Sequence, residues 1–432
     1  MKSIYEIFKE NAKSDKKIYF DDKVVSFKEL LERIESKKLP KIGKVALFLE
    51  NSIEFIEWLL LASKYNFTLV PFAKGMKVDF KKFGISHIYD GDLKKISNKS
   101  SYGYIIVSTS GSTSAPKPIV LTEEIKLKRI KIAIDTYKLD KNDTILVSTP
   151  LHHSLAQRGV LLALVLGIDL ILMKNFNTDK YLRNLKKATF TFSVSNQLEA
   201  IKEKINGDFN LKAIVSTSYA LNSDTKRKLL NYFPIYECYG TSEIGCVTHL
   251  SPEDVKIHPK SVGKALNGVD IKIKNGEILV KSPWRFKEYY NLPEITQESF
   301  EGEFFKTGDL GEIIDGFLYY KGRKKELIKT GGISVYPIDI EEVIKRVSGV
   351  KEVAVIGVED SYFGEVVVAV VVGDVEKKDI IRACSVLAPY QRPMYVDIVQ
   401  SLPKNSMGKI QKFKLKEKYK NLRIGEKIKG LK

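Results

Sequence analysis

Apolar residues recur at two different spacings along the first 70 residues. Segments 4–13 and 26–36 carry them every three or four positions, which predicts amphipathic helices. Segments 43–50 and 67–72 are short apolar runs typical of buried strands, and residues 52–66 between them form a helix with a wide apolar face. Strands that alternate with helices in this way predict a parallel sheet with crossover helices.

The same alternation continues to about residue 240. Residues 102–122 predict a strand, a loop and a second strand, and Thr122 followed by two glutamates predicts a helix start. The longest apolar run, residues 159–173, falls short of the roughly 20 apolar residues that span a bilayer. It predicts a buried helix that ends at Gly167, followed by a buried strand. Further strands are predicted at 143–150, 188–195, 212–221 and 235–240.

The pattern changes twice more. From about Val262 it consists of short strands and turns, as in 268–283 and 311–323, which predicts an antiparallel, barrel-like region. After that come helices at 337–347 and 379–388 and strands at 351–360, 364–374 and 395–403, which predict a small α+β domain.

The predicted fold class is therefore a multidomain α/β protein. A large N-terminal domain, residues 1–322, would contain parallel-rich sheets with flanking helices plus the small antiparallel β-barrel-like region. A small α+β C-terminal domain would occupy residues 326–432.

Charge changes this picture little. The 432 residues carry a formal net charge of +18, dispersed except in the tail, which suits polyanionic partners or a surface covered with solvated lysines. A nucleic-acid-binding module would need an aromatic stacking motif or a recognition helix, and the sequence contains neither.

The cysteines and the N-terminal segment indicate a compartment. Cys238, Cys246 and Cys384 form no CxxC motif, and their odd number and wide spacing predict unpaired thiols in a reducing environment. The first residues show no apolar signal-peptide core. We therefore expect a cytoplasmic protein without disulfides.

Residues 108–118, with the sequence STSGSTSAPKP, have the parts of a phosphate-binding loop. Backbone N–H groups in a tight turn, several hydroxyls and Lys117 can all contact anionic oxygens. The loop is not a Walker A motif, because Pro116 stands where that pattern needs glycine.

Four later motifs suit the chemistry of a nucleotide. Glu243 in YGTSE follows a predicted strand and would suit a Mg²⁺ ion that bridges phosphates. Asp309 in the KTGD turn would suit the two hydroxyls of a ribose. Gly331 and Gly332 indicate a special turn or a backbone close to a ligand, and Lys409 follows a glycine in PKNSMGKI. Each motif alone is weak evidence, whereas their order is specific.

In that order, the motifs resemble the successive core motifs of the adenylate-forming superfamily. It contains acyl- and aryl-CoA synthetases, peptide-synthetase adenylation domains and luciferases, and the resemblance runs from about residue 4 to residue 413. It implies that a carboxylate attacks the α-phosphorus of ATP to give acyl-AMP and pyrophosphate. A thiol, that of coenzyme A or of a carrier's phosphopantetheine, then takes the acyl group.

The resemblance also implies a role for each matching position. Phosphate contacts would come from Ser110, Gly111, Ser112, Thr113 and Lys117. The rest of ATP would contact Thr217, Ser218, Tyr239, Gly240, Ser242, Asp309 and Arg323. Glu243, with Thr113, would hold Mg²⁺. Lys409 would bridge the carboxylate and the α-phosphate, and His153 would border the acyl site as a second catalytic residue.

The second half-reaction would use the mobile C-terminal domain. Rotation about Lys325 would withdraw Lys409 and bring the loop of Gly331 and Gly332 to the tunnel for the thiol. Among the departures from the family pattern, Ser114 and Pro118 stand where glycine is usual in the phosphate loop, which makes that loop stiffer, and Ser242 replaces the usual threonine but keeps the hydroxyl. None of these departures removes a catalytic group.

The acyl pocket is predicted to be partly polar. His152, Arg158, Asn196 and Tyr219 fall in segments that border it, and Arg158 could either pair with a second carboxylate of the substrate or be structural. No Asp lies between Pro150 and Gly167 to bind an α-ammonium group, which disfavours amino acids as substrates.

We therefore predict a cytoplasmic acyl-CoA synthetase that uses ATP, Mg²⁺, coenzyme A and a non-amino carboxylic acid. An acyl-AMP ligase that loads an acidic carrier protein is the alternative within the same family. A catalytically silent relative is disfavoured because Lys409, Glu243 and Asp309 are all present.

Overall fold

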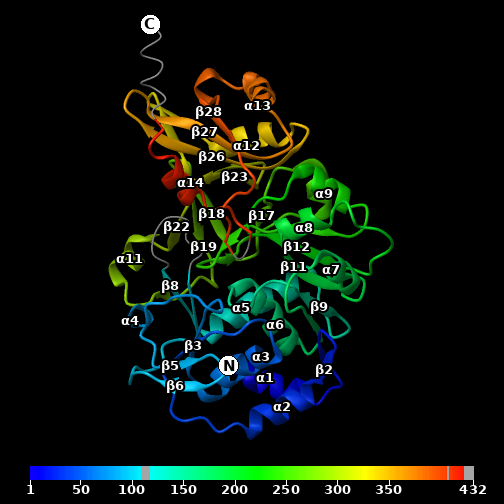
Figure 1. Ribbon diagram of the computed structural model, residues 1–432. Helices are drawn as coiled ribbons and strands as arrows, with labels where there is room; N and C mark the ends of the chain where they lie inside the picture. The colour runs from blue at the N-terminus through cyan, green and yellow to red at the C-terminus, as the bar shows by residue number, and fades with distance from the viewer. Residues whose placement is uncertain (109–116, 406–407, 423–432) are drawn as a thin grey trace.

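Two large sheets and a smaller C-terminal sheet form the framework of the protein (Figure 1). The computed structural model describes residues 1–108, 117–405 and 408–422. In Figure 1 the C-terminal strands and helices lie beyond one end of the larger N-terminal part, whose two large sheets contain the first half of the chain. The two-domain α/β fold predicted from the sequence is therefore confirmed.

The first seven-stranded sheet has the order β13-β12-β11-β9-β10-β1-β2. All neighbouring strands run parallel except β1 and β2, an edge hairpin that the sequence analysis did not predict. Its strands are β1 (Lys17–Phe20), β2 (Lys23–Ser26), β9 (Thr144–Val147), β10 (Asp169–Leu172), β11 (Phe190–Val194), β12 (Ala213–Thr217) and β13 (Ile235–Glu237).

The second seven-stranded sheet has the order β20-β8-β7-β4-β3-β5-β6. Its central strands are parallel, as the alternation of helices and strands predicts, and antiparallel strands close both edges. The strands are β3 (Lys44–Leu47), β4 (Thr68–Pro71), β5 (His87–Tyr89), β6 (Leu93–Lys95), β7 (Ile105–Ser108), β8 (Pro118–Leu121) and β20 (Glu288–Tyr289).

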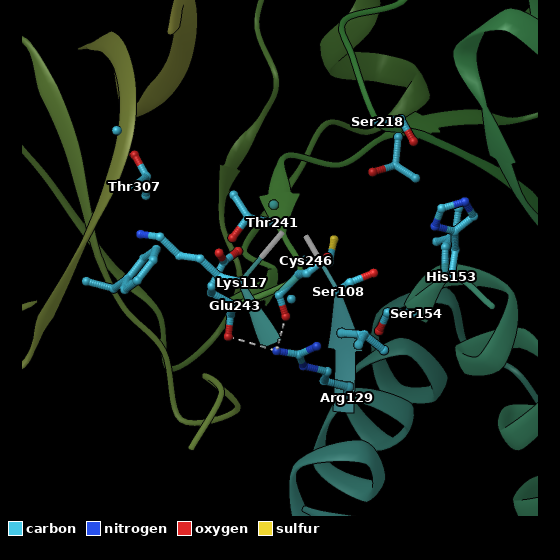
Figure 2. A pocket seen from close by; sticks show the side chains of 18 of the residues that line it. Ser108, Lys117, Arg129, His153, Ser154, Ser218, Thr241, Glu243, Cys246 and Thr307 are labelled. Atoms are coloured by element: carbon cyan, nitrogen blue, oxygen red, sulfur yellow. Dashed lines mark hydrogen bonds between the residues drawn. The ribbon is translucent and has the colours of Figure 1, made fainter. Parts of the chain in front are cut away.

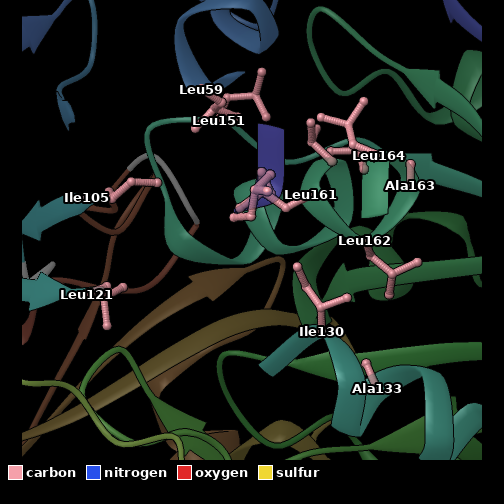
Figure 3. Packing of buried hydrophobic residues seen from close by; sticks show 14 of the residues in the cluster. Leu59, Ile105, Leu121, Ile130, Ala133, Leu151, Leu161, Leu162, Ala163 and Leu164 are labelled. Carbon is pink, nitrogen blue, oxygen red and sulfur yellow. The ribbon is translucent and has the colours of Figure 1, made fainter. Parts of the chain in front are cut away.

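Helices α1, α2, α3, α5 and α6 share one core with both sheets, and α7, α8 and α9 pack in a second cluster on the first sheet. Figure 3 shows Leu161 and Leu162 of α6 near Ile130 of α5 and Leu59 of α3, and the same cluster includes residues of both sheets. The helices of this part are α1 (Ile4–Asn11), α2 (Phe27–Ser36), α3 (Ile53–Tyr65), α4 (Phe80–Phe83), α5 (Glu123–Tyr137), α6 (Ser154–Leu166), α7 (Thr178–Leu185), α8 (Ser195–Ile201), α9 (Ser223–Leu229), α10 (Pro252–Ile257) and α11 (Pro293–Glu298).

Local signals set the ends of the two helices that border the site. The Thr122 side chain accepts a hydrogen bond from the backbone N–H of Ile125 at 3.2 Å and so caps α5, as predicted. Helix α6 ends where Gly167 adopts a φ of 71°, a left-handed conformation that favours glycine. Among the described residues no helix is both long and apolar enough to cross a membrane.

The region after Val262 is an open antiparallel sheet. It has the order β18-β19-β22-β21, with β23 paired to β22, so the antiparallel prediction is confirmed, whereas a closed barrel does not form among the described strands. Its strands are β18 (Asp270–Lys274), β19 (Glu277–Lys281), β21 (Phe300–Glu301), β22 (Phe304–Ile314) and β23 (Phe317–Arg323). Two short ribbons precede it: β14 (Gly240–Thr241) with β15 (Gly245–Cys246), and β16 (Thr248–His249) with β17 (Lys264–Ala265).

The C-terminal sheet is buried on both faces. Alternate residues of β27 pack into different clusters: Val367 and Ala369 lie on the side of α12 and α13, and Val366 and Val368 on the side of α14. A continuous apolar run is what such a two-sided strand requires. The elements are β24 (Ile328–Thr330), β25 (Ile333–Val335), α12 (Pro337–Lys345), β26 (Val350–Asp360), β27 (Gly364–Gly373), α13 (Lys377–Ala383), β28 (Tyr395–Ile398) and α14 (Lys412–Tyr419). Short 3-10 turns are η1 (Lys324–Glu326), η2 (Cys384–Val386) and η3 (Pro389–Gln391).

The structure corrects the prediction that the protein has no disulfides. Cys238 and Cys246 form one, and their Cα atoms lie 6.0 Å apart. The reason is the β14–β15 ribbon, in which Gly240 pairs with Cys246 and thereby returns the chain to Cys238. Cys384 is a buried free thiol. The disulfide closes the base of the turn that carries Glu243.

A buried ion pair joins α9 to β13. Lys226 pairs with Glu237, and both side chains are buried. Glu237 also accepts a hydrogen bond from the backbone N–H of Leu221 at 3.0 Å, and Lys226 donates to the carbonyl oxygen of Pro259 at 2.8 Å. This pair therefore connects three segments at the edge of the first sheet.

Lys226→Met should destabilise the protein, because it leaves the Glu237 carboxylate buried without its partner. We expect the free energy of unfolding to fall by about 3–5 kcal/mol in chemical denaturation. Lys228→Met, which removes an exposed partner of Glu203 on the same helix, should cost less than about 1 kcal/mol. An equal loss in the two variants would contradict the assignment.

Candidate functional site

A cavity of about 800 Å³ opens between the N-terminal sheets and the C-terminal part. Ser108 at the end of β7 and Thr217 at the end of β12 line it, together with side chains from α5, α6 and the loop that carries Lys409. Carboxyl ends of parallel strands are the usual ligand sites of α/β sheets. Figure 2 shows part of this wall, with Lys117, Glu243 and Arg129 on one side and His153 on another.

The centre of the predicted phosphate loop lies outside the described residues. Ser110, Gly111, Ser112, Thr113 and Ser114 all belong to this segment, so their predicted roles stay predictions. The residues that flank it, Ser108 and Lys117, line the cavity. Lys117 places its ammonium group 4.9 Å from the centre of the Tyr289 ring, and Pro118 begins the buried strand β8.

Glu243 sits in the turn between β14 and β15, where its side chain and its backbone have separate tasks. The carboxylate accepts a hydrogen bond from the Tyr289 hydroxyl at 2.9 Å. The Glu243 carbonyl oxygen accepts hydrogen bonds from Arg129 at 2.9 Å and from the backbone N–H of Phe286. The backbone contacts hold the turn, which leaves the carboxylate at the cavity wall beside Ser242.

This carboxylate suits Mg²⁺ that arrives with a nucleotide. Within the described ranges no three His, Cys, Asp or Glu side chains gather into a cluster that could hold a metal ion. Mg²⁺ is commonly bound through one or two carboxylates together with substrate phosphates, so a single glutamate near the phosphate-loop flanks fits this mode.

Asp309 and Arg323 face each other across β22 and β23. Their register pairs them directly, and the Arg323 Nε lies 2.8 Å from Asp309 Oδ1. Asp309 Oδ2 accepts a hydrogen bond from the Tyr239 hydroxyl at 2.7 Å. Burial raises the pKa of Asp309, against the opposing effect of Arg323. Arg323 lines the cavity, and the buried Asp309 and Tyr239 stand behind it.

The loop with Lys409 reaches the cavity from the C-terminal part. The Lys409 backbone N–H donates to the Asn405 side chain at 2.9 Å, and both residues line the cavity. Burial, followed by repulsion from Arg323, lowers the pKa of Lys409. Gly408 adopts a φ of 75°, and a Cβ there would lie 1.9 Å from Nδ2 of Asn196 on α8. The glycine therefore permits this close approach.

The predicted hinge residue and the two glycines of the predicted thiol-tunnel loop occupy different surroundings. Lys325 lies in η1 and lines the cavity. Gly331 and Gly332 form the turn between β24 and β25, with φ values of 55° and 80°, and are exposed away from the cavity. Their predicted role requires a different arrangement of the two parts of the chain.

Most of the residues predicted to border the acyl group line one of two cavities. His152, His153 and Arg158 line the large one, and burial lowers the pKa of His152 to about 4 and that of His153 to about 3, so both rings are neutral at pH 7. Asn196 lines a neighbouring cavity of about 380 Å³ that shares His152. Tyr219 is 38% exposed, away from the lining of both.

Most of the residues predicted from the sequence thus line the large cavity. The predicted residues that line the large cavity are Lys117, His152, His153, Arg158, Thr217, Ser218, Gly240, Ser242, Glu243, Arg323, Lys325 and Lys409. The sequence analysis missed Lys126 and Arg129, which also line it. The available signal was their place on the apolar stripe of α5, where Ile130 and Ala133 lie one turn further on.

Two family models match the chain. Residues 81–290 match the AMP-binding enzyme model, and residues 339–409 match the AMP-binding enzyme C-terminal domain. The second match contains Lys409, and the first contains the phosphate loop and Glu243.

Curated relatives cover most of the chain. It is 33% identical to the long-chain-fatty-acid–CoA ligase FadD13 of Mycobacterium tuberculosis over 337 residues, 73% of this chain and 67% of the relative. It is 30% identical to the 2-succinylbenzoate–CoA ligase of Listeria monocytogenes over 401 residues, 88% of this chain and 85% of the relative.

Solved structures share the fold over nearly the whole length. ATP-bound MatB from Rhodopseudomonas palustris superposes with a TM-score of 0.86 at 25% identity, covering 97% of this chain and 99% of the other. MenE from Bacillus subtilis with an acyl-adenylate intermediate gives a TM-score of 0.87 at 22% identity, covering 96% and 98%.

Proposed function

We propose the following residue roles for this chain, which belongs to the AMP-binding enzyme family. Its relatives over most of its length are acid–CoA ligases, and it is an AMP-forming acid–CoA ligase. The prediction of an adenylate-forming enzyme that uses ATP and coenzyme A is thereby confirmed. Loading of a carrier protein is not favoured by these relatives.

The observation that carries the proposal is that Lys409 enters the cavity from the C-terminal part and meets the nucleotide-side residues of the N-terminal part. In the first half-reaction, an oxygen of the acid attacks the α-phosphorus, the P–O bond to pyrophosphate breaks, and acyl-AMP forms. The ammonium group of Lys409 would lie between the two negatively charged reactants and reduce their repulsion. Transfers of this kind depend on positioning and charge neutralisation.

The remaining contacts of ATP would follow the geometry of the wall. Lys117, with Ser110, Gly111, Ser112 and Thr113, would hold the phosphates, and Glu243 would hold the Mg²⁺ that neutralises them. Arg323, held by Asp309, would contact the ribose, and Thr217, Ser218 and Gly240 would contact the rest of the nucleoside, while Tyr239 would support Asp309 from behind. His153, half-buried and neutral, would border the acyl group without adding charge.

In the second half-reaction the thiolate of coenzyme A attacks the acyl carbon, and AMP leaves. We propose that residues 1–322 and 326–432 are the two domains, and that they rotate about Lys325 to bring Gly331 and Gly332 to the site. Lys412 supports this division, because its ammonium group lies 2.7 Å from Glu341 and 3.6 Å from Glu326, and therefore ties α14 to η1 beside the hinge.

The proposal predicts acid-dependent release of pyrophosphate. A panel of carboxylic acids with ATP and Mg²⁺ should show continuous turnover and AMP formation only when coenzyme A is present. A single stoichiometric burst of pyrophosphate that coenzyme A leaves unchanged would indicate a carrier-protein ligase instead. No release with any acid, from enzyme that still binds ATP, would indicate a silent relative.

A further inference from the structure

Three buried cations lie on the cavity-facing sides of α5 and α6. Lys126, Arg129 and Arg158 are 2%, 4% and 9% exposed, and all three line the large cavity. Charged side chains are almost never buried to this degree unless they are paired. In the part of the chain that the structure describes, no carboxylate forms an ion pair with any of them.

Arg129 has a structural explanation. Its guanidinium donates to the carbonyl oxygens of Trp284 at 3.0 Å, Ser242 at 3.1 Å and Glu243 at 2.9 Å, and Figure 2 shows Arg129 beside Glu243. Three carbonyl acceptors satisfy the fork of donors and hold the turn that bears the metal ligand. Arg129 therefore does not need an anion from the substrate.

Lys126 and Arg158 lack such an explanation. The Lys126 amine donates to neutral groups only, Gln157 at 2.9 Å and Ser154 at 3.3 Å, and burial, followed by repulsion from Arg129 and Arg158, lowers its pKa well below the ordinary value of a lysine. Arg158 Nε is buried without a hydrogen-bond partner among the described residues. The guanidinium stacks instead over the Phe192 ring, 4.8 Å from its centre. A buried donor without an acceptor costs about 1–3 kcal/mol, and more when it is charged.

The surroundings place Arg158 at the acyl end of the cavity. Its neighbours in the lining include Ile130, Leu161 and Phe192, which are apolar. Burial lowers its pKa only to about 10, so it stays charged at neutral pH. The neighbouring His152 and His153 are neutral and offer no competing charge. A charged guanidinium thus lines a cavity wall in which apolar and polar side chains are mixed.

We propose that this pocket takes an acid with a second anionic group, a dicarboxylic acid, whose second carboxylate binds Arg158 with Lys126 beside it. The inference rests on the proposed function, because it concerns the acyl part of the same site. Arginine presents parallel N–H donors that match a carboxylate in a bidentate pair. The second carboxylate would accept hydrogen bonds from the part of the Arg158 guanidinium that lines the cavity, while the reacting carboxylate faces Lys409.

The first test needs no variant. The wild-type enzyme is assayed for thioester formation with ATP, Mg²⁺ and coenzyme A on straight-chain dicarboxylic acids of three to eight carbons. Each diacid is compared with its monomethyl ester and with the monocarboxylic acid of equal length. We expect kcat/KM for the best diacid to exceed that of its half-ester and of the monoacid by about 100-fold or more, since buried polar groups strongly reject analogues that leave them unpaired.

Variants then locate the second carboxylate. Arg158→Leu should lower kcat/KM for the best diacid by about 100-fold and change it for the half-ester by less than threefold. Arg158→Lys should retain part of the diacid activity. Lys128 lies on the outer face of α5 and pairs with Glu124. Lys128→Met should leave kcat/KM unchanged for both the diacid and the half-ester. A thermal shift on adding ATP checks that each variant is folded.

Each other outcome is decisive. Turnover of monoacids or half-esters at rates equal to or above those of the diacids overturns the inference and leaves the proposed function intact. An equal loss on both substrates in folded Arg158→Leu also overturns it, because Arg158 would then serve the reacting centre. No turnover of any acid overturns the proposed function itself.

Discussion

Lys409→Ala should abolish most of the adenylation half-reaction and spare the thioester half-reaction. We expect pyrophosphate exchange dependent on the acid to fall by about 10²–10³-fold, the usual cost of removing one preorganised group that stabilises developing charge. When synthetic acyl-AMP and coenzyme A are supplied, thioester formation should stay within about threefold of the wild type, because the proposed rotation about Lys325 withdraws Lys409 before that step.

The split between the two half-reactions is the informative result. Lys404→Ala is the matched control, since Lys404 lies in the same loop but forms an exposed pair with Glu352 at 2.7 Å. It should leave both half-reactions near wild type. If Lys409→Ala slowed both half-reactions equally, the lysine would act by holding the loop rather than by bridging the reactants.

The apolar pattern predicted the fold well because its signals are local and strong. Helix α6 and strand β10 came from one apolar run with a glycine at the break, and α5 came from a capping threonine before acidic residues. The edge hairpin β1–β2 was missed. Its strands have only four residues each. Its turn requires a φ of 52° at Asp21, and no glycine marks this turn in the sequence.

The sequence predicted those residues of the site that belong to ordered motifs. It did not predict features that depend on contacts between distant residues. Glu243 and Lys409, which the order of the motifs singled out, line the cavity, and Asp309 lies behind Arg323 at its wall. The disulfide between Cys238 and Cys246 was not predicted, because only the β14–β15 ribbon turns an eight-residue separation into proximity. A count of cysteines does not contain that pairing.

The buried basic residues of α5 also could not be recognised from the sequence. Lys126 and Arg129 follow helical spacing on a stripe of apolar residues, so the pattern alone could equally describe side chains that reach the surface. Only the packed structure shows that Arg129 is satisfied by three carbonyl oxygens and that Lys126 is not offset by a carboxylate. The distinction between a structural and a substrate-binding cation is therefore a property of contacts.

Glu243→Gln should separate the proposed metal-binding role of the Glu243 carboxylate from the structural role of its carbonyl oxygen. The turn is held by the Glu243 carbonyl oxygen through Arg129 and Phe286, and glutamine keeps both that carbonyl and an acceptor for the Tyr289 hydroxyl. The variant should therefore fold normally while it loses the negative charge that attracts Mg²⁺. We expect adenylation at a fixed Mg²⁺ concentration to fall by about 100-fold, or ~2.7 kcal/mol in activation free energy.

The dependence on metal concentration provides the sharper test of this residue. In Glu243→Gln the Mg²⁺ concentration for half-maximal pyrophosphate exchange should rise, and excess Mg²⁺ should recover part of the rate. Tyr289→Phe, which removes only the hydroxyl that donates to Glu243 at 2.9 Å, should shift this half-maximal Mg²⁺ concentration far less. An unchanged Mg²⁺ dependence in Glu243→Gln with a reduced rate would mean that the carboxylate acts on the nucleotide without the metal, and Mg²⁺ would then be held through the phosphates alone.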